Sequence, residues 1–579
     1  MATTTKTANI GTGKAMTGKV LALLLAVGGC TGSIEGGGTG TGQMGNGSNQ
    51  TGTGTGTPVP TPTKVGSCAD GDVAGRRLLR RLTGPEFEAT VRTTFKLNGP
   101  GSWVGLLPPD PAATNGFSNN VERLTIGSEY VSAAEDTAKR VADLVANDTT
   151  LASLLPCASK GDEACANTFL DTYGVKLYRR PLTPDERTQY TNLFTKIRAQ
   201  NDFSTWVYWT VTAMLQSPNV LYRSELGEMG SDGRYQLTQY EIASALAFTF
   251  TGAPPDDGLM QLAATNKLST PDQLEAAARS LMFNPDNTPR ATFVQLVLNF
   301  AEEWLGLTSL DNKIKDATAF PDFNETVQAS MEEETRQFIA AVIFGYRGKP
   351  ADLFTAPFTY VDATLAKYYG FGNAPANGFA RAERPTGWGT GLLGQGSMLA
   401  VKSGSLSTSP TKRGHMVRTQ MLCYAVPPPP PVVPDLPDPM AAKTTRERYE
   451  KLHATDALCK GCHQMMDPIG FGLEHLDAAG RFRDKENGYP IDATGTLLAT
   501  SAGDLSFNGA EELGRAVASL PESASCMAAF IASYSFGVDD QTSTCMVHNA
   551  TTQLLSGGLN ILDYYAVMAR SQHFRTRTP

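Results

Sequence analysis

HATDALCKGCHQMMDPIGFGLEHLDAAGRFRD, residues 453–484, is the most informative stretch of this sequence, because it holds Cys459, Cys462 and His463 in a C-x-x-C-H motif. The chain has 579 residues, of which 9 are cysteine and 6 are histidine. A random sequence of this composition would contain the motif on the order of 10⁻³ times. The motif therefore indicates a specific chemistry rather than coincidence.

The motif is predicted to lie on a helix that Thr455 caps and that ends near Asp467, since Pro468 disfavours helical geometry in the residue before it. Helical positions three apart share a face, so both cysteines can reach the two vinyl groups at one edge of a haem. His463 then follows in the right place to be the proximal ligand of the iron. The spacing predicts one covalently attached haem c per chain.

Two other chemistries suit a pair of cysteines less well here. A zinc site usually needs two such pairs, and the chain holds one C-x-x-C. A thiol–disulfide oxidoreductase places its dithiol at a helix N-terminus in a βαβ setting, and no such pattern surrounds this motif. A structural disulfide between Cys459 and Cys462 stays open as an alternative.

The chain resembles the planctomycete-type cytochrome c multidomain family, which consists of exported proteins built of several domains of unknown function. Besides the motif stretch, the segments that carry the resemblance are RRLTGPEFEATVRTTF (80–95), YRRPLTPDE (178–186), LQSPNVLYRSELG (215–227), YQLTQYEIASALAFTFTGAPPDD (235–257), TSPTKRG (408–414), PPPPP (427–431) and AVASLPESASCMAAFIASYSFG (516–537). Together they cover nearly the whole chain. The resemblance implies a large exported haem-c protein and supplies no substrate.

The N-terminus has the layout of an export signal. In KVLALLLAVGGCTGS (19–33), lysines precede a short apolar core, and small residues lead to Cys30. This resembles a bacterial lipoprotein signal, whose cysteine is lipidated and becomes the mature N-terminus. Cleavage without lipidation and a start at Met16 stay open. No apolar run is long enough to span a bilayer, so we expect an exported protein, lipid-anchored at the outer membrane, the periplasmic face or the cell surface.

Composition limits the partners and suggests disulfides. The net charge of −8 gives no reason to expect nucleic acid. Outside Cys30 and the motif, six cysteines remain, an even number in a compartment that permits disulfides. Of the 15 connectivities that six cysteines allow, the short spacings favour Cys157–Cys165 and Cys526–Cys545, which leaves Cys68–Cys423.

The sequence predicts a mainly α, multidomain helical protein with a c-type-cytochrome-like haem module and a disordered N-terminal tether. Thr83, Thr183, Thr238 and Thr270 each precede a helical pattern with Glu or Gln three residues later, which is the signature of a capping box. The stretch after Glu325 is amphipathic, with one apolar face formed by Met331, Phe338, Ile339 and Val342.

Composition and motifs divide the chain into six segments: a lipoprotein signal (1–30), a Gly/Thr/Pro-rich disordered tether (31–66), N-terminal helical modules (67–232), a central helical module (233–370), the haem-attachment module (371–490) and a C-terminal helical module (491–579). Five prolines at 427–431 must adopt polyproline II. They form either a stiff strap across the protein's own surface or a segment that docks in a partner's aromatic groove.

A sixth iron ligand is not evident from the motif, because Met465 and Met466 are too near His463 to reach the opposite face of the haem. The candidates for this sixth ligand lie downstream at Met527, Met546 and His548 and upstream at His415 and Met416. With one of them bound, the protein is an electron carrier. With none bound, the iron is five-coordinate and can bind a small molecule.

The residues after the motif helix suggest supporting roles. Arg481 and Arg483 are candidates to pair with haem propionates. Asp467, Glu474 and Asp477 are candidates to hold the following loop or to accept hydrogen bonds from those arginines. An equally good interpretation is a solvated turn with local salt bridges.

Three functions follow from these features. The first is an exported, lipid-anchored mono-haem c-type protein that transfers electrons to a redox partner protein. The second is a haem-dependent oxidase or peroxidase that acts on an extracellular substrate. The third is a surface binding or structural lipoprotein in which Cys459–Cys462 is a disulfide. The sequence identifies neither the redox partner nor the substrate.

Overall fold

The computed structural model describes residues 74–99, 103, 105–111, 117–427, 436–453, 457–538 and 545–579. The predicted signal with Cys30, the tether, Cys68 and the cap residue Thr455 lie outside the described residues. So do residues 428–431 of the polyproline segment. The predictions made for these residues therefore stay predictions.

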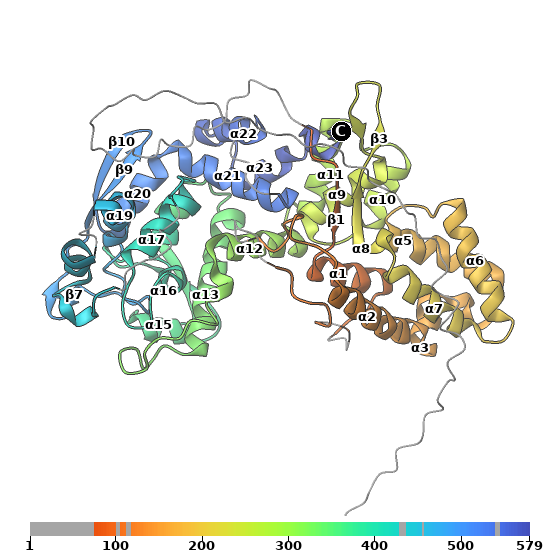
Figure 1. Cartoon of the computed structure of the whole chain (residues 1–579), viewed down its shortest axis with the longest axis horizontal. Helices are drawn as coiled ribbons and strands as arrows, with labels where there is room; N and C mark the ends of the chain where they lie inside the picture. The colour runs from red at the N-terminus through yellow and green to blue at the C-terminus, as the bar shows by residue number, and fades with distance from the viewer. Residues whose placement is uncertain are drawn as a thin grey trace, which may run out of the picture. The chain divides into compact units, whose positions relative to one another are not determined.

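The described residues are mainly helical, which confirms the predicted fold class (Figure 1). The N-terminal helices are α1 (Gly84–Phe95), α2 (Ser128–Ala146), α3 (Asp148–Leu154), α4 (Glu163–Phe169), α5 (Val175–Tyr178), α6 (Pro184–Arg198), α7 (Phe203–Leu215) and α8 (Pro218–Leu221). They are followed by α9 (Gln239–Thr251), α10 (Asp257–Ala264), α11 (Pro271–Met282), α12 (Ala291–Leu305), α13 (Glu325–Ala340), α14 (Asp352–Thr355) and α15 (Ala363–Tyr369).

The C-terminal helices are α16 (Gly396–Val401), α17 (Pro410–Met416), α18 (Thr445–Glu447), α19 (Ala457–Phe471), α20 (Gly509–Ser519), α21 (Pro521–Phe536), α22 (Cys545–Ser556) and α23 (Ile561–Met568). Four π-helical turns adjoin α-helices, namely η4 (Leu170–Gly174), η6 (Ala341–Gly345), η8 (Val417–Met421) and η10 (Arg448–His453). Short 3₁₀ turns are η3 (Pro156–Ser159), η5 (Leu307–Ser309), η7 (Gly391–Gly394), η9 (Pro439–Ala441) and η11 (Gln572–Phe574).

The four predicted threonine caps are all present. At Thr83, Thr183, Thr238 and Thr270 the hydroxyl accepts the backbone N–H of the third helical residue, and that residue's side chain accepts the cap's own N–H. Each box satisfies two of the N–H groups that a helix start leaves without an intrahelical partner. The local sequence therefore determines where α1, α6, α9 and α11 begin.

The strands are short and antiparallel. The pairs are β1 (Leu78–Arg81) with β2 (Tyr222–Glu225), β5 (Phe358–Val361) with β6 (Ala380–Glu383), β7 (Lys485–Glu486) with β8 (Tyr489–Pro490), and β9 (Thr494–Thr500) with β10 (Gly503–Asn508). A three-stranded sheet has β4 (Tyr235–Gln236) between β3 (Glu228–Met229) and β11 (Thr576–Arg577). Two of these pairings, β1–β2 and β4–β11, join segments that are far apart in the sequence.

Two large hydrophobic clusters organise the described residues. One is built from the N-terminal helices, between Leu82 and Phe248. The other takes Phe117 and residues from Leu237 to Phe574, and so includes the central, haem-attachment and C-terminal segments in one core. The predicted apolar face of α13 is buried, as expected. The boundaries between the predicted modules stay predictions.

The disulfides are partly as predicted. Cys157–Cys165 is present, whereas Cys423 bonds to Cys526, so the predicted pairs Cys526–Cys545 and Cys68–Cys423 are wrong. The reason is the packing of α21. Cys526 lies on the side of α21 that faces the end of η8, where its sulfur is 3.6 Å from the Gln420 carbonyl. Cys545, although close in sequence, begins the next helix.

A buried charge cluster, which we call the Glu225 cluster, joins three remote parts of the chain. It consists of Arg80 on β1, Arg223 and Glu225 on β2 and Arg577 on β11. Glu225 lies 2.9 Å from Arg223 and 3.9 Å from Arg80, and it also accepts a hydrogen bond from Arg577. Burial raises the pKa of Glu225, but the three guanidinium groups outweigh burial and hold that pKa below its usual range.

His573, beside this cluster, makes the fold sensitive to acid. Burial and then Arg577 lower the pKa of His573 from 6.5 to about 3, and its ring stacks on Phe536 at 3.8 Å. Between these two pH values the unfolded chain binds a proton that the folded chain does not bind. Stability is therefore full above pH 6.5 and falls as the pH decreases, by at most about 1.4 kcal/mol per pH unit for this group.

We expect His573→Gln to flatten the dependence of stability on pH between 6.5 and 4.5, because glutamine does not titrate. Below pH 4.5 both proteins should lose stability, since the depressed pKa of Glu225 adds its own acid dependence. Urea unfolding of both proteins at several pH values measures this difference, and all other titrating groups cancel between them. Parallel stability curves would show that His573 is not the sensitive group.

Candidate haem-attachment site

The C-x-x-C-H motif lies on α19, as the sequence predicts. Cys459 is within the helix, and its side chain is outside the described part of the structure. Cys462 is half-buried and makes no disulfide with a described residue. Their spacing of three places both cysteines on one face of the helix, which is the arrangement that covalent attachment to one haem edge requires.

The helix does not end at Asp467, so that prediction is wrong. It continues through Pro468 to Phe471, because close packing on two sides holds this segment helical. A side chain on Gly470 would lie 2.1 Å from the Pro410 carbonyl oxygen of α17, and one on Gly495 of β9 would lie 2.1 Å from the Pro468 carbonyl oxygen. Tertiary contact therefore overrides the local preference of the residue before proline.

Helices α17 and α19 pack backbone to backbone and run antiparallel. Gly414 of α17 lies against Met466 of α19, and Pro410 lies against Gly470. A Cβ atom on Gly414 would be 1.9 Å from the Met466 carbonyl oxygen. Glycine is required at both crossings because no side chain fits between the two backbones.

This crossing brings Thr411 of α17 onto the motif. Asp467 Oδ2 lies 2.8 Å from His463 Nδ1, and Asp467 Oδ1 accepts a hydrogen bond from Thr411 Oγ1 at 2.7 Å. Thr411 Oγ1 is 3.4 Å from His463 Nδ1. The His463 side chain is 16% exposed and that of Asp467 is 7% exposed. One carboxylate is thus shared between the histidine and the threonine in a largely buried position.

These residues fit a haem c. A histidine that ligates a metal almost always donates its other ring N–H to a carboxylate or carbonyl group, which fixes the ring orientation and raises the basicity of the ligand. Asp467 is placed to do this at Nδ1, so an iron would be bound through Nε2. The His463–Asp467 pair was not predicted, although a spacing of four residues on a predicted helix indicates that two side chains can meet.

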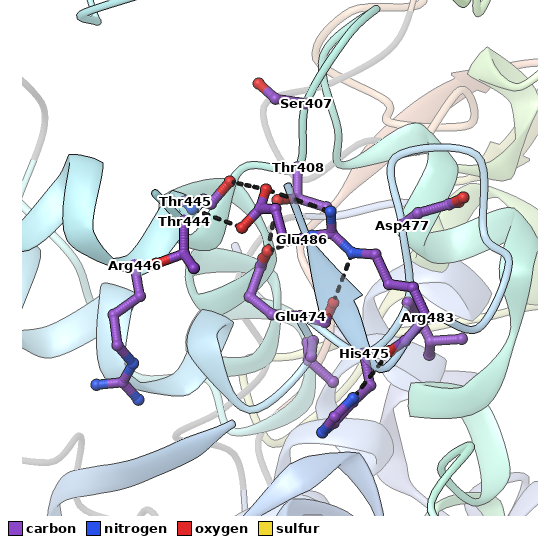
Figure 2. Close-up of polar contacts among 12 residues, drawn as sticks. Ser407, Thr408, Thr444, Thr445, Arg446, Glu474, His475, Asp477, Arg483 and Glu486 are labelled. Carbon is purple, nitrogen blue, oxygen red and sulfur yellow. Dashed lines mark hydrogen bonds and ion pairs between the residues drawn. The ribbon is translucent and has the colours of Figure 1, made fainter. Parts of the chain in front are cut away.

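Arg481 and Arg483 each lie beside carboxylates of the same region. Arg483 lies 2.8 Å from Glu474 and 3.2 Å from Glu486 (Figure 2). Arg481 lies 3.2 Å from Asp477. The predicted local salt bridges are present, and Glu474 and Asp477 accept hydrogen bonds from these arginines. The turn is not solvated as that interpretation had it, because both carboxylates are buried. Pairing of the arginines with haem propionates stays a prediction.

The loop after α19 is held by an arginine that the sequence analysis did not single out. Arg413 of α17 is fully buried and donates to the backbone carbonyls of Leu473, Leu476 and Asp477. Glu474 lies 3.7 Å from this guanidinium and also accepts from Thr408. Burial raises the pKa of Glu474 despite the two arginines beside it. Helix α17 therefore fixes both the histidine and the loop that follows it.

The candidate sixth ligands are spread over other elements. Met527 on α21 is 3% exposed and belongs to the large C-terminal core, and Met546 on α22 packs against the same core. His548 is also on α22. The elements that pack most closely on α19 are α17 and β9, and of the candidates only His415 and Met416 lie on one of these. The sixth ligand of the iron therefore stays a prediction.

The described residues form a mainly helical protein with a C-x-x-C-H motif on α19. Four family models match the chain, each described as a protein of unknown function: PSD3 (DUF1587) at residues 80–147, PSD5 (DUF1595) at 165–225, PSD4 (DUF1592) at 237–371 and PSCyt3 (DUF1588) at 389–486. The chain belongs to the planctomycete-type cytochrome c multidomain family that these domains make up.

Membership in this family implies a haem-type cofactor, and its members are typically exported. No curated protein and no solved structure matches this chain. In the described part of the chain, no single helix has the length and hydropathy of a membrane span. One bent pair, α20 with α21, passes that test by length and composition only.

Proposed function

We propose that this chain is an exported mono-haem c-type protein that transfers electrons at the cell envelope, held there by a lipid on Cys30. Cys459 and Cys462 would hold the haem covalently, and His463 would ligate its iron. When bound, the haem supplies a reversible one-electron couple. A redox partner protein would accept or deliver the electron.

The observation that carries this proposal is the 2.8 Å contact between His463 Nδ1 and Asp467 Oδ2. Histidines of a C-x-x-C sequence that forms only a disulfide have no need of a buried carboxylate, whereas metal-ligating histidines almost always have such a partner. The backbone contact between α17 and α19 holds the ring and the carboxylate in place. A site on rigid helices keeps its ligand geometry better than a site on loops.

We expect wild-type protein, produced together with cytochrome c maturation machinery, to gain the mass of one haem and to show a reduced visible spectrum with a sharp α-band. The double substitution Cys459→Ala/Cys462→Ala should remove that mass completely, because no thiol remains for attachment. Intact-mass spectrometry measures both, and the same measurement reports a lipid on Cys30. Cys545→Ala, on α22 and outside the motif, is the matched control and should keep the haem.

A contrary result would be a wild-type chain that lacks haem and is two hydrogens lighter than its free-thiol form at the motif. That result would replace electron transfer with the function of a surface binding or structural lipoprotein, in which Cys459–Cys462 is a disulfide.

A second candidate function is a haem-dependent oxidase or peroxidase that acts on an extracellular substrate. The observation that favours it is that the Met527 side chain is buried in the packed core. If Met527 does not ligate the iron and no other residue replaces it, the iron is five-coordinate and open to a small molecule. Carbon monoxide added to the reduced sample separates the two functions. A large spectral change would favour the enzyme, and an unchanged low-spin spectrum would favour the electron carrier.

A further inference from the structure

We propose that Asp467 and Thr411 set the reduction potential of this protein by controlling how strongly His463 donates electron density to the iron. Both are positioning residues that act through the histidine. This inference rests on the proposed haem attachment and deepens it, because it states which side chains of this chain tune the couple and in which direction each one acts.

The geometry is a chain of three side chains from two helices. Asp467 presents Oδ2 to His463 Nδ1 at 2.8 Å and Oδ1 to the Thr411 hydroxyl at 2.7 Å. His463 and Asp467 are four residues apart on α19 and therefore share a face. With the carboxylate only 7% exposed, its charge is poorly screened by water and acts strongly on the ring.

The two contacts of the carboxylate act in opposite directions. A carboxylate that accepts a hydrogen bond from Nδ1–H gives the ring more imidazolate character. Nε2 then becomes a stronger electron donor to a bound metal. A stronger donor stabilises the ferric state relative to the ferrous state and lowers the potential. The Thr411 hydroxyl donates to the same carboxylate and withdraws charge from it. Thr411 therefore weakens the effect of Asp467 on His463 and raises the potential.

The packing keeps Thr411 in this position. Gly414 and Pro410 on the same helix are in backbone contact with α19, at Met466 and Gly470 respectively. Helix α17 cannot slide along or away from α19 without breaking both contacts. The Thr411 hydroxyl is thus a fixed part of the histidine's surroundings rather than a surface group that happens to point towards it.

The test is a redox titration of the haem-loaded full-length protein, followed by its visible spectrum at one fixed pH. We expect Asp467→Asn to raise the midpoint potential by at least the 59 mV that corresponds to a tenfold change in a one-electron equilibrium. Thr411→Val should shift the potential by a smaller amount in the opposite direction, because the carboxylate then bonds to His463 alone.

The matched control is Thr195→Val on α6, which makes the same chemical change away from α17 and α19. Its exposed hydroxyl bonds to the Thr191 carbonyl of its own helix. The control should leave the potential unchanged. If Asp467 and Thr411 had only a structural role, their two variants would lose stability without shifting the potential in opposite directions.

The outcomes separate the inference from the proposed function. If wild-type protein carries no haem, the proposed function fails and the inference fails with it. If haem is attached but neither variant shifts the potential, the inference is overturned. It is also overturned if both variants shift the potential in the same direction, and in both cases the proposed haem attachment is unaffected. If Asp467→Asn does not fold, the sign of the shift in Thr411→Val decides alone.

Discussion

Gly414→Ala should destabilise the haem-attachment segment by about 3 kcal/mol or more, because the added methyl group would lie 1.9 Å from the Met466 carbonyl oxygen and 2.6 Å from its carbonyl carbon. Both are backbone atoms of α19, so no rotation of a side chain relieves the overlap. The helices must separate, and Thr411 then moves away from Asp467. We expect a lower midpoint in urea unfolding and less haem attached per chain.

A suitable control for this change is Gly345→Ala at the end of η6, where an added Cβ meets nothing within 4 Å. A glycine in a helical turn costs roughly 0.5–1 kcal/mol relative to alanine. The control should therefore be neutral or slightly stabilising. If Gly414→Ala behaved like the control, the two helices would not be in backbone contact in solution.

Glu225→Gln should lower the free energy of unfolding by about 3–5 kcal/mol, because it removes the carboxylate at the centre of three buried guanidinium groups. Arg80, Arg223 and Arg577 are each less than a tenth exposed. Arg223 would keep its 3.5 Å ion pair with Glu86 but lose the closer one with Glu225. Burial lowers the pKa of Arg80, but only to about 10, so Arg80 stays charged at neutral pH and would be left beside two other guanidinium groups.

The matched control for Glu225→Gln is Glu228→Gln on the neighbouring strand β3, where the side chain is exposed. It makes the same chemical change and should alter stability by less than 0.5 kcal/mol, which is about the limit for surface substitutions. Equal effects of the two changes in urea unfolding would mean that the Glu225 cluster does not hold β1, β2 and β11 together.

The two disulfides show which cysteine pairs can be predicted from their spacing in the sequence. Cys157 and Cys165 are eight residues apart across one turn, and they form a bond as predicted. Cys526 and Cys423 are separated by 103 residues, and sequence spacing gave no reason to join them. The direction in which Cys526 points is fixed by the packing of α21 on η8, which is a property of the tertiary structure.

The same division holds at the candidate site. The positions of Cys459, Cys462 and His463 on a helix follow from the motif, and helical periodicity could have predicted the His463–Asp467 pair. The contact of Thr411 with Asp467 could not be predicted in this way, because Thr411 lies on a helix more than forty residues earlier in the chain. Nothing local marks the threonine as a neighbour of the motif.

The sequence by itself determined the starts of α1, α6, α9 and α11, the mainly α class, the helix that carries the motif and the family, because capping, periodicity and motif spacing are local properties of the chain. Only the tertiary structure decided that α19 continues through Pro468, that Asp467 is shared with Thr411 and that Glu225 joins three remote strands. Each of these depends on groups brought together by burial. The free energy that stabilises these three features comes from close backbone contact and from interactions between charges held away from water. Such contacts and interactions form only when distant segments of the chain pack together.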